Sequence, residues 1–369
     1  MNTNNYLVIM AGGIGSRFWP MSTAEKPKQF LDILGTGKTL LQQTVHRFRN
    51  IVPAENIYIV TSANYQQLAL EQIPELNASQ VLLEPCMRNT APCIAYAAWK
   101  INRQNPEANI VVAPSDHLIT DEPQFEQVIQ TGLDFTAAND TLLTLGMKPH
   151  RPETGYGYIQ ADQKGNQFSP EPSGLNSPFS IHTVAAFKEK PNRKTAQQYL
   201  NEGSYYWNSG IFIWSVPSIM KAIRSYLPDI AKIFDKGKDA YYTEHEQTFI
   251  NEHFPSCPKI SVDYGIMEKA DNIFVLPADF GWSDLGTWGS LWEKRERNND
   301  GNTIVGSGVH LFECADTIVH VPNERPMVLQ GLDGYIVVEA NGVLLICKKE
   351  EEQRIKDFRE SVIAMNNVQ

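Results

Sequence analysis

The sequence predicts an α/β protein in which a doubly wound, mostly parallel sheet is followed by a small all-β domain. Over the first 150 residues, short continuous apolar runs alternate with segments of helical spacing. That alternation is typical of buried parallel strands joined by helices that cover both faces of the sheet. From about residue 302 to residue 347 the chain breaks into short β-like runs separated by turn residues, which favours an all-β region.

The first strand is expected at 6–10, where the run YLVIM ends just before Gly12. Its apolar residues are continuous because both faces of a parallel strand are buried. Further strands are expected at 57–61, 81–83, 109–113 and 141–145. The helices between them are expected at 40–48, 65–72, 91–101 and 122–138. Ligands of such sheets bind beyond the carboxyl ends of the strands, so the loops at that edge are candidates for a site.

After residue 150 the pattern changes. Residues 155–160 and 183–189 alternate as antiparallel strands do, and residues 170–178, rich in Pro, Ser and Gly, are interpreted as an exposed loop. Helices are expected at 193–202, 217–226, 228–241, 244–252 and 350–362.

Turn chemistry near residues 298–302 (NNDGN) marks the expected boundary between the two domains. We therefore predict a large domain at 1–298 and a small domain at 299–369. The short, closely spaced strands of the small domain suit a few coils of a β-helix.

Composition and charge exclude several classes of protein. The net charge of −10 argues against a general binder of nucleic acid or anionic membranes, because both partners are negatively charged. No run of about 18 apolar residues predicts a membrane span, and the first residues lack the features of a signal peptide. The five scattered cysteines are interpreted as reduced thiols. We expect a cytoplasmic protein with no nucleic-acid and no membrane partner.

The strongest local signal is MAGGIGSR, followed shortly by KPKQFL. Three glycines (Gly12, Gly13 and Gly15) follow the first expected strand and let backbone N–H groups approach phosphate oxygens. The planar guanidinium of Arg17 can donate two hydrogen bonds to one phosphate. Lys28 can neutralise charge on a phosphate under attack. Together these residues predict a phosphate-binding loop rather than a simple strand-to-helix turn.

Two other nucleotide-binding motifs do not match this sequence, because each lacks a glycine that it requires. A dinucleotide fingerprint beginning at Gly13 would need its third glycine at the position of Phe18. The stretch GTGKT ends like a P-loop, but that motif would need its first glycine at the position of Asp32. We interpret GTGKT as a turn before the helix expected at 40–48.

Carboxylates supply a second signal. Asp116 comes just after an expected strand, and Asp284 lies in a turn flanked by Gly and Trp. Two carboxylates from distant loops suit Mg²⁺, which takes oxygen ligands and substrate phosphates. Asp121 and Asp263 are interpreted as cap or turn residues. A structural hydrogen bond is the expected role of His117.

These blocks resemble the signature of the sugar nucleotidyltransferase superfamily, GG-x-G-x-R followed by PK-x-L. The stretches MAGG, FWPMS and KPKQFL resemble its mannose-1-phosphate guanylyltransferase family. Further blocks follow in the same order over about residues 6–290, namely EP with RNTAP, PSDH, ETGYGY, FKEKP, WNSG, SVDY and WSDLGTW. The resemblance implies a Rossmann-like nucleotidyltransferase fold. Residues 300–369 resemble the left-handed β-helix-like tail of single-function members.

The resemblance also implies a role for each site residue. Arg17 and Lys28 are catalytic, and Asp116 and Asp284 hold Mg²⁺. The residues implied to bind the nucleotide are Ala11, Gly12, Gly13, Gly15, Ser16, Glu84, Arg88, Asn89, Thr90, Ser115 and Asp116. For Asn89 and Thr90 the alternative of a plain helix cap stays open. The residues implied to bind the sugar phosphate are Gly155, Tyr156, Glu189, Lys190, Asn208 and Gly210. The block around Asp263 also resembles part of the sugar pocket.

The implied reaction transfers GMP from GTP to α-D-mannose 1-phosphate and yields GDP-mannose and pyrophosphate by in-line attack on the α-phosphorus. It needs no acid or base, because the attacking oxygen is already anionic; positioning and charge neutralisation do the work. One alternative is a transferase for another base or sugar 1-phosphate. Another is a non-catalytic sensor of nucleotide sugars. A fused phosphomannose isomerase is not expected in a chain ending at Gln369, and a homodimer through exposed strands of the small domain is.

Overall fold

The structure, a computed structural model, describes residues 2–162, 167–168, 179–321 and 326–366. The loop expected at 170–178 lies outside these residues. The chain forms two compact units that interleave along the sequence. The first unit contains residues 1–12, 44–115 and 119–282, and the second contains residues 13–43, 116–118 and 283–369. The domain boundary expected between residues 298 and 299 remains a prediction.

A ten-stranded sheet forms the centre of the first unit, in the order β3-β2-β1-β4-β9-β5-β10-β8-β6 with β7 paired to β8. Its first five strands are β1 (Asn5–Met10), β2 (Ile57–Ser62), β3 (Val81–Glu84), β4 (Asn109–Pro114) and β5 (Leu142–Met147). The other five are β6 (Tyr158–Ala161), β7 (Gln167–Phe168), β8 (Ile181–Lys188), β9 (Tyr205–Ser215) and β10 (Ile273–Ala278). Strands β3, β2, β1 and β4 are parallel neighbours, as the continuous apolar runs predict.

Strand β9 makes the sheet mixed, because it runs antiparallel between β4 and β5. Asn208 and Gly210, both expected to bind the sugar phosphate, lie inside β9. They lie where the register with β5 shifts between Thr144 and Gly146, and such an irregularity re-aims side chains. Strand β10 was not predicted at all, because Pro277 interrupts its sequence pattern.

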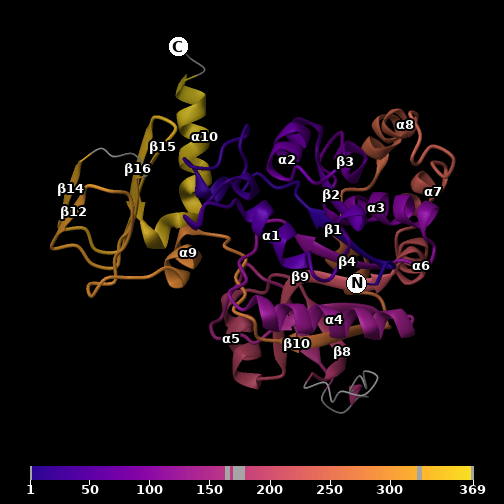
Figure 1. Cartoon of the computed structure of the whole chain (residues 1–369). Helices are drawn as coiled ribbons and strands as arrows, with labels where there is room; N and C mark the ends of the chain where they lie inside the picture. Colours follow the sequence, from indigo (N-terminus) through magenta and orange to yellow (C-terminus); the bar gives the residue numbers. More distant parts are fainter. Residues whose placement is uncertain (1, 163–166, 169–178, 322–325, 367–369) are drawn as a thin grey trace. The chain divides into compact units, whose positions relative to one another are not determined.

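Helices cover both faces of this sheet (Figure 1). Helices α3 (Thr90–Gln104), α6 (Val216–Tyr226) and α7 (Pro228–Asp235) contribute to one large apolar core with strand residues such as Tyr6 and Val8. On the other face, α4 (Glu122–Ala138) contacts β4, β5 and β9, and Phe125 packs edge-on against Phe48 and Phe280. The remaining helices up to residue 253 are α1 (Leu40–Phe48), α2 (Gln66–Gln72), α5 (Arg193–Glu202) and α8 (Glu246–His253).

The second unit carries the all-β tail in two small sheets. One contains β11 (Thr303–Val305), β13 (Ile318–His320), β15 (Tyr335–Ala340) and β16 (Val343–Lys348). The other contains β12 (Val309–Phe312) and β14 (Met327–Gln330). All pairs are parallel except β15 with β16. The tail is therefore all-β, as we expected, and the left-handed β-helix stays a prediction.

The all-β tail shares one apolar core with the phosphate-binding loop of the same unit. Phe18 and Trp19, close to that loop, are buried in this core together with Trp288 of α9 (Trp288–Lys294). Strand residues Ile318 and Ile336 belong to it as well, as does Ile355 at the start of α10 (Ile355–Asn366). The tail is therefore built into the unit that contains residues 13–43.

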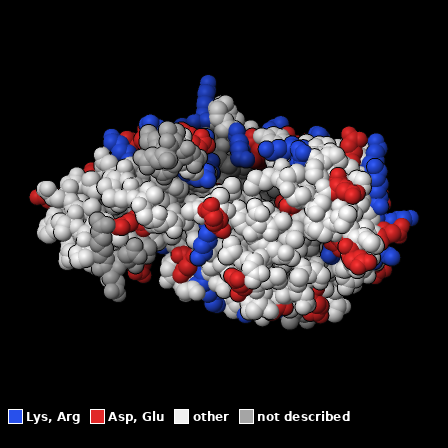
Figure 2. Space-filling view, turned by 90° about the horizontal axis from the view of Figure 1, so that it is seen from above, with Lys and Arg blue, Asp and Glu red and all other residues white. Residues whose placement is uncertain are grey.

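The charged side chains form no large single-sign area on the face drawn in Figure 2, where both signs are scattered among uncharged residues. Within the described ranges, none of the helices combines the length and the apolar character that crossing a membrane requires.

Candidate active site

The loop that the sequence predicts to bind phosphate, residues 10–17, is shaped around Lys28. Gly15 adopts a left-handed backbone with φ of 66°, a conformation that glycine reaches at little cost. A Cβ atom at this position would lie 2.4 Å from Cβ of Lys28, so the lysine stem fills the space that a side chain would need. Ser22 Oγ donates a 2.6 Å hydrogen bond to the carbonyl of Gly15, and the backbone N–H of Lys28 donates to Ile14 O at 3.3 Å.

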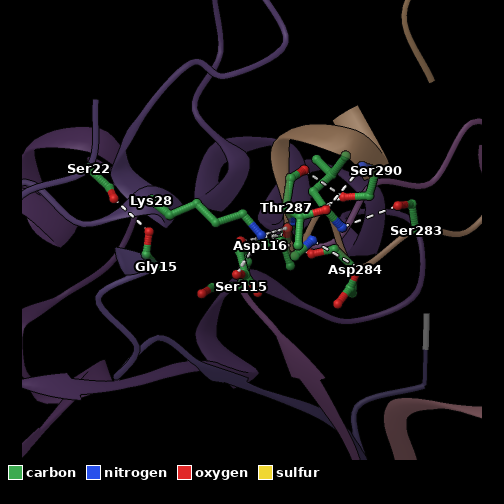
Figure 3. Close-up of polar contacts among 12 residues, drawn as sticks. Gly15, Ser22, Lys28, Ser115, Asp116, Ser283, Asp284, Thr287 and Ser290 are labelled. Carbon is green, nitrogen blue, oxygen red and sulfur yellow. Dashed lines mark hydrogen bonds and ion pairs between the residues drawn. The ribbon is translucent and has the colours of Figure 1, made fainter. Parts of the chain in front are cut away.

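Lys28 contacts both predicted metal ligands, the carboxylate of Asp116 and the backbone of Asp284 (Figure 3). Its Nζ lies 2.8 Å from Asp116 Oδ2 and 3.3 Å from the carbonyl oxygen of the same residue. It also donates to the carbonyl oxygen of Asp284 at 2.9 Å. The Lys28 side chain is only 3% exposed and its Nζ lies 5.4 Å from the centre of the Phe18 ring. A cation held this firmly has little freedom left to lose when a phosphate binds.

The environment of Asp116 keeps its carboxylate ionised. Burial by itself would raise the pKa of Asp116, but the positive charge of Lys28, with smaller contributions from His117 and from hydrogen bonds, holds that pKa below its ordinary value. The side chain is still 32% exposed. Asp284 Oδ1 accepts a 2.9 Å hydrogen bond from the N–H of Gly286, which fixes the orientation of that carboxylate.

These groups line one cavity of about 190 Å³. The residues around it are Gly15, Ser16, Arg17, Lys28, Asp116, His117, Asp284 and Gly286. All belong to the second unit, although they come from three distant stretches of sequence. The structure thus gathers both residues predicted to be catalytic, both predicted metal ligands and two further predicted nucleotide-binding residues around one cavity.

Mg²⁺ fits this donor set. Mg²⁺ takes oxygen ligands, and a site completed by substrate phosphates and water needs only one or two carboxylates from the protein. The described residues contain no group of three or more His, Cys, Asp or Glu that could hold a metal by itself. Asp116 and Asp284 are the two aspartates around this cavity and could hold Mg²⁺ together with a phosphate ligand.

Glu84, at the end of β3 in the first unit, is a buried carboxyl group whose pKa is set by burial alone. Its side chain is 8% exposed, and Oε1 has no hydrogen-bond partner among the residues that the structure describes. Burial raises its pKa to about 8. A Cβ atom at Gly12 would lie 3.4 Å from Oε2 of Glu84, so the first glycine of the loop lies directly beside this buried carboxyl group.

The other nucleotide-side residues of the first unit have local structural roles. Arg88 donates to the carbonyl oxygen of Pro255. Asn89, with φ of 68°, caps α3 by accepting from the N–H of Thr90, so the open alternative of a helix cap is confirmed for Asn89. Thr90 Oγ1 accepts from the N–H of Val262 at 2.9 Å.

Two more nucleotide-side residues follow strands of the parallel part of the sheet. Ala11 accepts a 2.8 Å hydrogen bond from Thr61 Oγ1 at its carbonyl oxygen. Ser115 donates its N–H to the carbonyl oxygen of Met10 at 3.1 Å. Both residues therefore lie at the carboxyl edge of the sheet, where the sequence predicted a ligand site. Asp121 caps α4 by accepting from the N–H of Gln124, which confirms the structural role that we expected for it.

The predicted sugar-phosphate residues form a polar cluster elsewhere in the first unit. Glu189 and Lys190 make a 2.7 Å ion pair, and Lys190 has a strained φ of 47°. The N–H of Lys190 donates to the carbonyl oxygen of Tyr156. A Cβ atom at Gly157 would lie 2.4 Å from Glu189 Oε2, so a side chain here would displace that carboxylate. Gly155 donates its N–H to Glu153 Oε1.

Asp263 belongs to the same cluster, although the residue pattern alone was interpreted as that of a cap or turn residue. Asn208 Nδ2 donates to Asp263 Oδ1 at 2.9 Å, and Asn208 Oδ1 accepts from Thr144 Oγ1 and from the N–H of Gly210. Burial and the nearby negative charge of Glu189 raise the pKa of Asp263 to about 6. The signal in the sequence was the SVDY block, which we interpreted mainly as a turn.

Known proteins that are similar to this chain are nucleotidyl transferases. A family model described as nucleotidyl transferase matches residues 6–300. The mannose-1-phosphate guanylyltransferase of Escherichia coli (strain K12) is 36% identical over 366 residues, which are 97% of this chain and 73% of that protein. The mannose-1-phosphate guanylyltransferase of Salmonella montevideo is 37% identical over 358 residues, with 96% and 73% covered.

A solved structure is similar over the whole length of the chain. It is that of a protein from Thermus thermophilus described as a mannose-1-phosphate geranyltransferase, with a TM-score of 0.83, 27% identity, and 98% of this chain and 99% of that one covered. The chain therefore belongs to the nucleotidyl transferase family and is an enzyme related to the mannose-1-phosphate guanylyltransferases.

Proposed function

We propose that this enzyme transfers GMP from GTP to α-D-mannose 1-phosphate and releases GDP-mannose and pyrophosphate. The observation that carries the proposal is the convergence on Lys28, whose Nζ contacts Asp116 Oδ2 at 2.8 Å and the Asp284 carbonyl at 2.9 Å. A buried cation that is paired with the carboxylate of Asp116, and that lies in one cavity with Asp284 and Gly15, is suited to stabilising charge on a phosphoryl group in transfer.

The reaction forms one bond and breaks one. An oxygen of the sugar 1-phosphate attacks the α-phosphorus of GTP in line, and the bond from that phosphorus to the bridging oxygen of the β-phosphate breaks. The electron pair leaves with pyrophosphate, and no proton has to move. Lys28 would neutralise charge that builds up on the α-phosphoryl oxygens, while Arg17 and the backbone N–H groups near Gly15 would hold the leaving pyrophosphate.

Mg²⁺ would be held by Asp116 and Asp284 and would offset the negative charge of the phosphates when bound. The lowered pKa of Asp116 supports this assignment, because an ionised carboxylate is the form that a cation binds. The ion pair between Lys28 and Asp116 also keeps the lysine oriented before the substrate arrives.

Glu84 favours guanine over other bases. Its carboxyl group is buried and has an oxygen without a partner among the described residues. Guanine presents two neighbouring donors, N1–H and the 2-amino group, and these would favour the ionised form of Glu84, in which both oxygens accept, over the protonated form that burial alone favours. Uracil and thymine present one N–H between two carbonyl oxygens, which a carboxylate would repel. A buried polar group left unsatisfied by the wrong ligand is a strong basis for discrimination.

The cluster of Glu189, Lys190, Asn208 and Asp263 supports binding of a sugar phosphate. Lys190 supplies a cation, and the two carboxylates supply acceptors for sugar hydroxyl groups. Binding a hydroxyl group would also offset the repulsion between the lone pairs of Glu189 and Asp263.

The test is release of pyrophosphate from purified protein with mannose 1-phosphate and Mg²⁺, comparing GTP, UTP, dTTP and ATP, with and without EDTA. We expect turnover with GTP that EDTA abolishes. Lys28→Met should abolish it, whereas Lys26→Met, which alters an exposed lysine two residues away, should not.

Two results would replace the proposal. Preferred turnover of another nucleotide would keep the mechanism and move the activity to another base. Binding of GDP-mannose without turnover of any substrate pair would instead indicate the non-catalytic sensor.

A further inference from the structure

The segment that precedes α10 contacts the phosphate-binding loop directly. Arg17 Nε donates a 2.9 Å hydrogen bond to Gln353 Oε1, across 336 positions of sequence. Both residues belong to the second unit, and both side chains are exposed apart from this contact. Arg17 is one of the residues that line the cavity with Lys28, Asp116 and Asp284.

Glu352, the residue before Gln353, contacts the helix that follows Asp284. Glu352 Oε2 accepts a 2.7 Å hydrogen bond from the N–H of Gly289, in the first turn of α9. That helix begins four residues after Asp284, and a carboxylate near a helix N-terminus is favourable because of the exposed N–H groups there. Two consecutive side chains therefore contact the loop of Arg17 and the helix that follows Asp284.

The backbone beneath these two residues is anchored in the apolar core. Ile355 is fully buried, and Phe358 and Val362 pack against the same core as Phe18 and Trp288. Because these side chains hold the start of α10 against the core, the backbone of Gln353 has little freedom to move. A hydrogen bond from a fixed point can restrict a long, exposed arginine side chain that has many rotamers of its own.

We propose that Gln353 is a positioning residue that holds Nε of Arg17 and so presents the two Nη groups of the guanidinium to the phosphates of the nucleotide. The geometry of the guanidinium supports this division, because Nε and the Nη atoms donate in different directions from one plane. The all-β tail and its terminal helix thereby act on the nucleotide through Arg17. This inference rests on the proposed function of Arg17 as a ligand of the leaving pyrophosphate.

The test compares Gln353→Met, which keeps the length of the side chain and removes the acceptor, with Lys356→Met. Lys356 is exposed and lies three residues further along the chain, so it is a matched control. We expect Gln353→Met to lower kcat/KM for GTP about tenfold and to change KM for mannose 1-phosphate less than about twofold. Gln353→Glu should restore activity, because a carboxylate is also an acceptor for Nε.

A double-mutant cycle separates positioning from a general structural effect. If Gln353 acts through Arg17, then Gln353→Met should have no further effect in a protein that already carries Arg17→Met. An equal loss in both backgrounds would overturn the proposal, as would a wild-type kcat/KM in Gln353→Met. Thermal unfolding of each variant shows whether it is folded.

Calorimetric binding of inorganic pyrophosphate gives a readout that does not depend on turnover. We expect Gln353→Met to weaken it about as much as it lowers kcat/KM, and unchanged binding would contradict positioning of Arg17. If the wild-type protein binds pyrophosphate but turns over no substrate pair, the proposed reaction fails while the role of Gln353 can still be judged from binding alone.

Discussion

Glu84→Gln should make the protein more stable at neutral and alkaline pH. Glu84 is 8% exposed and burial is the cause of its shifted pKa, so ionising it costs free energy in the folded state but not in the unfolded chain. Burial moves its pKa from 4.5 to about 8. At about 1.4 kcal/mol for each pKa unit, the penalty is on the order of 3 kcal/mol at pH 7 and 5 kcal/mol at pH 9.

The sign of the pH dependence follows from proton binding. The folded state binds the proton of Glu84 more tightly than the unfolded state, so this contribution to stability is complete below pH 4.5 and is lost as the pH rises through about 8. Glutamine has nearly the same volume and does not titrate. The variant should therefore match the wild-type protein near pH 4.5 and exceed it increasingly at higher pH.

Urea unfolding between pH 5 and pH 9 measures this difference. Wild-type and variant curves that stay parallel over this range would refute the assignment of a raised pKa to Glu84. The same variant tests base recognition, because an amide offers one donor and one acceptor. We expect it to use GTP less well and UTP or dTTP better than the wild-type protein does.

Three further predictions concern the cavity and the sugar cluster. Lys28→Met, which keeps the buried stem, should lower kcat by about 100-fold or more, measured by pyrophosphate release, and a wild-type kcat would exclude a catalytic role. Gly15→Ala should destabilise the protein by about 1–2 kcal/mol and also lower kcat, because its Cβ would displace Lys28; normal stability in urea would contradict this. In the wild-type protein KM for mannose 1-phosphate should rise as the pH falls through about 6, where Asp263 takes up a proton. Asp263→Asn should abolish that pH dependence, and a rise in KM that persists in the variant would assign it to another group.

The parallel half of the sheet could be predicted because its strands are buried on both faces and read as continuous apolar runs. The half of the sheet that contains antiparallel strands was predicted less completely. Strand β10 contains Pro277 and was not predicted, and β9 lies between β4 and β5 although it follows both in sequence. Strand order depends on long-range pairing, which leaves little trace in a local pattern of residues.

The sequence by itself determined the chemistry of the phosphate-binding loop, since glycines, Arg17, Lys28 and two aspartates can be recognised from residue type and local context. Only the tertiary structure decided which of them meet. Lys28 contacts a residue 88 positions away and another 256 positions away, and Arg17 contacts Gln353. Likewise, the raised pKa values of Glu84 and Asp263 come from burial and, for Asp263, from neighbouring charge. Both depend on how the chain packs, and neither is a property of the residue or of its neighbours in sequence.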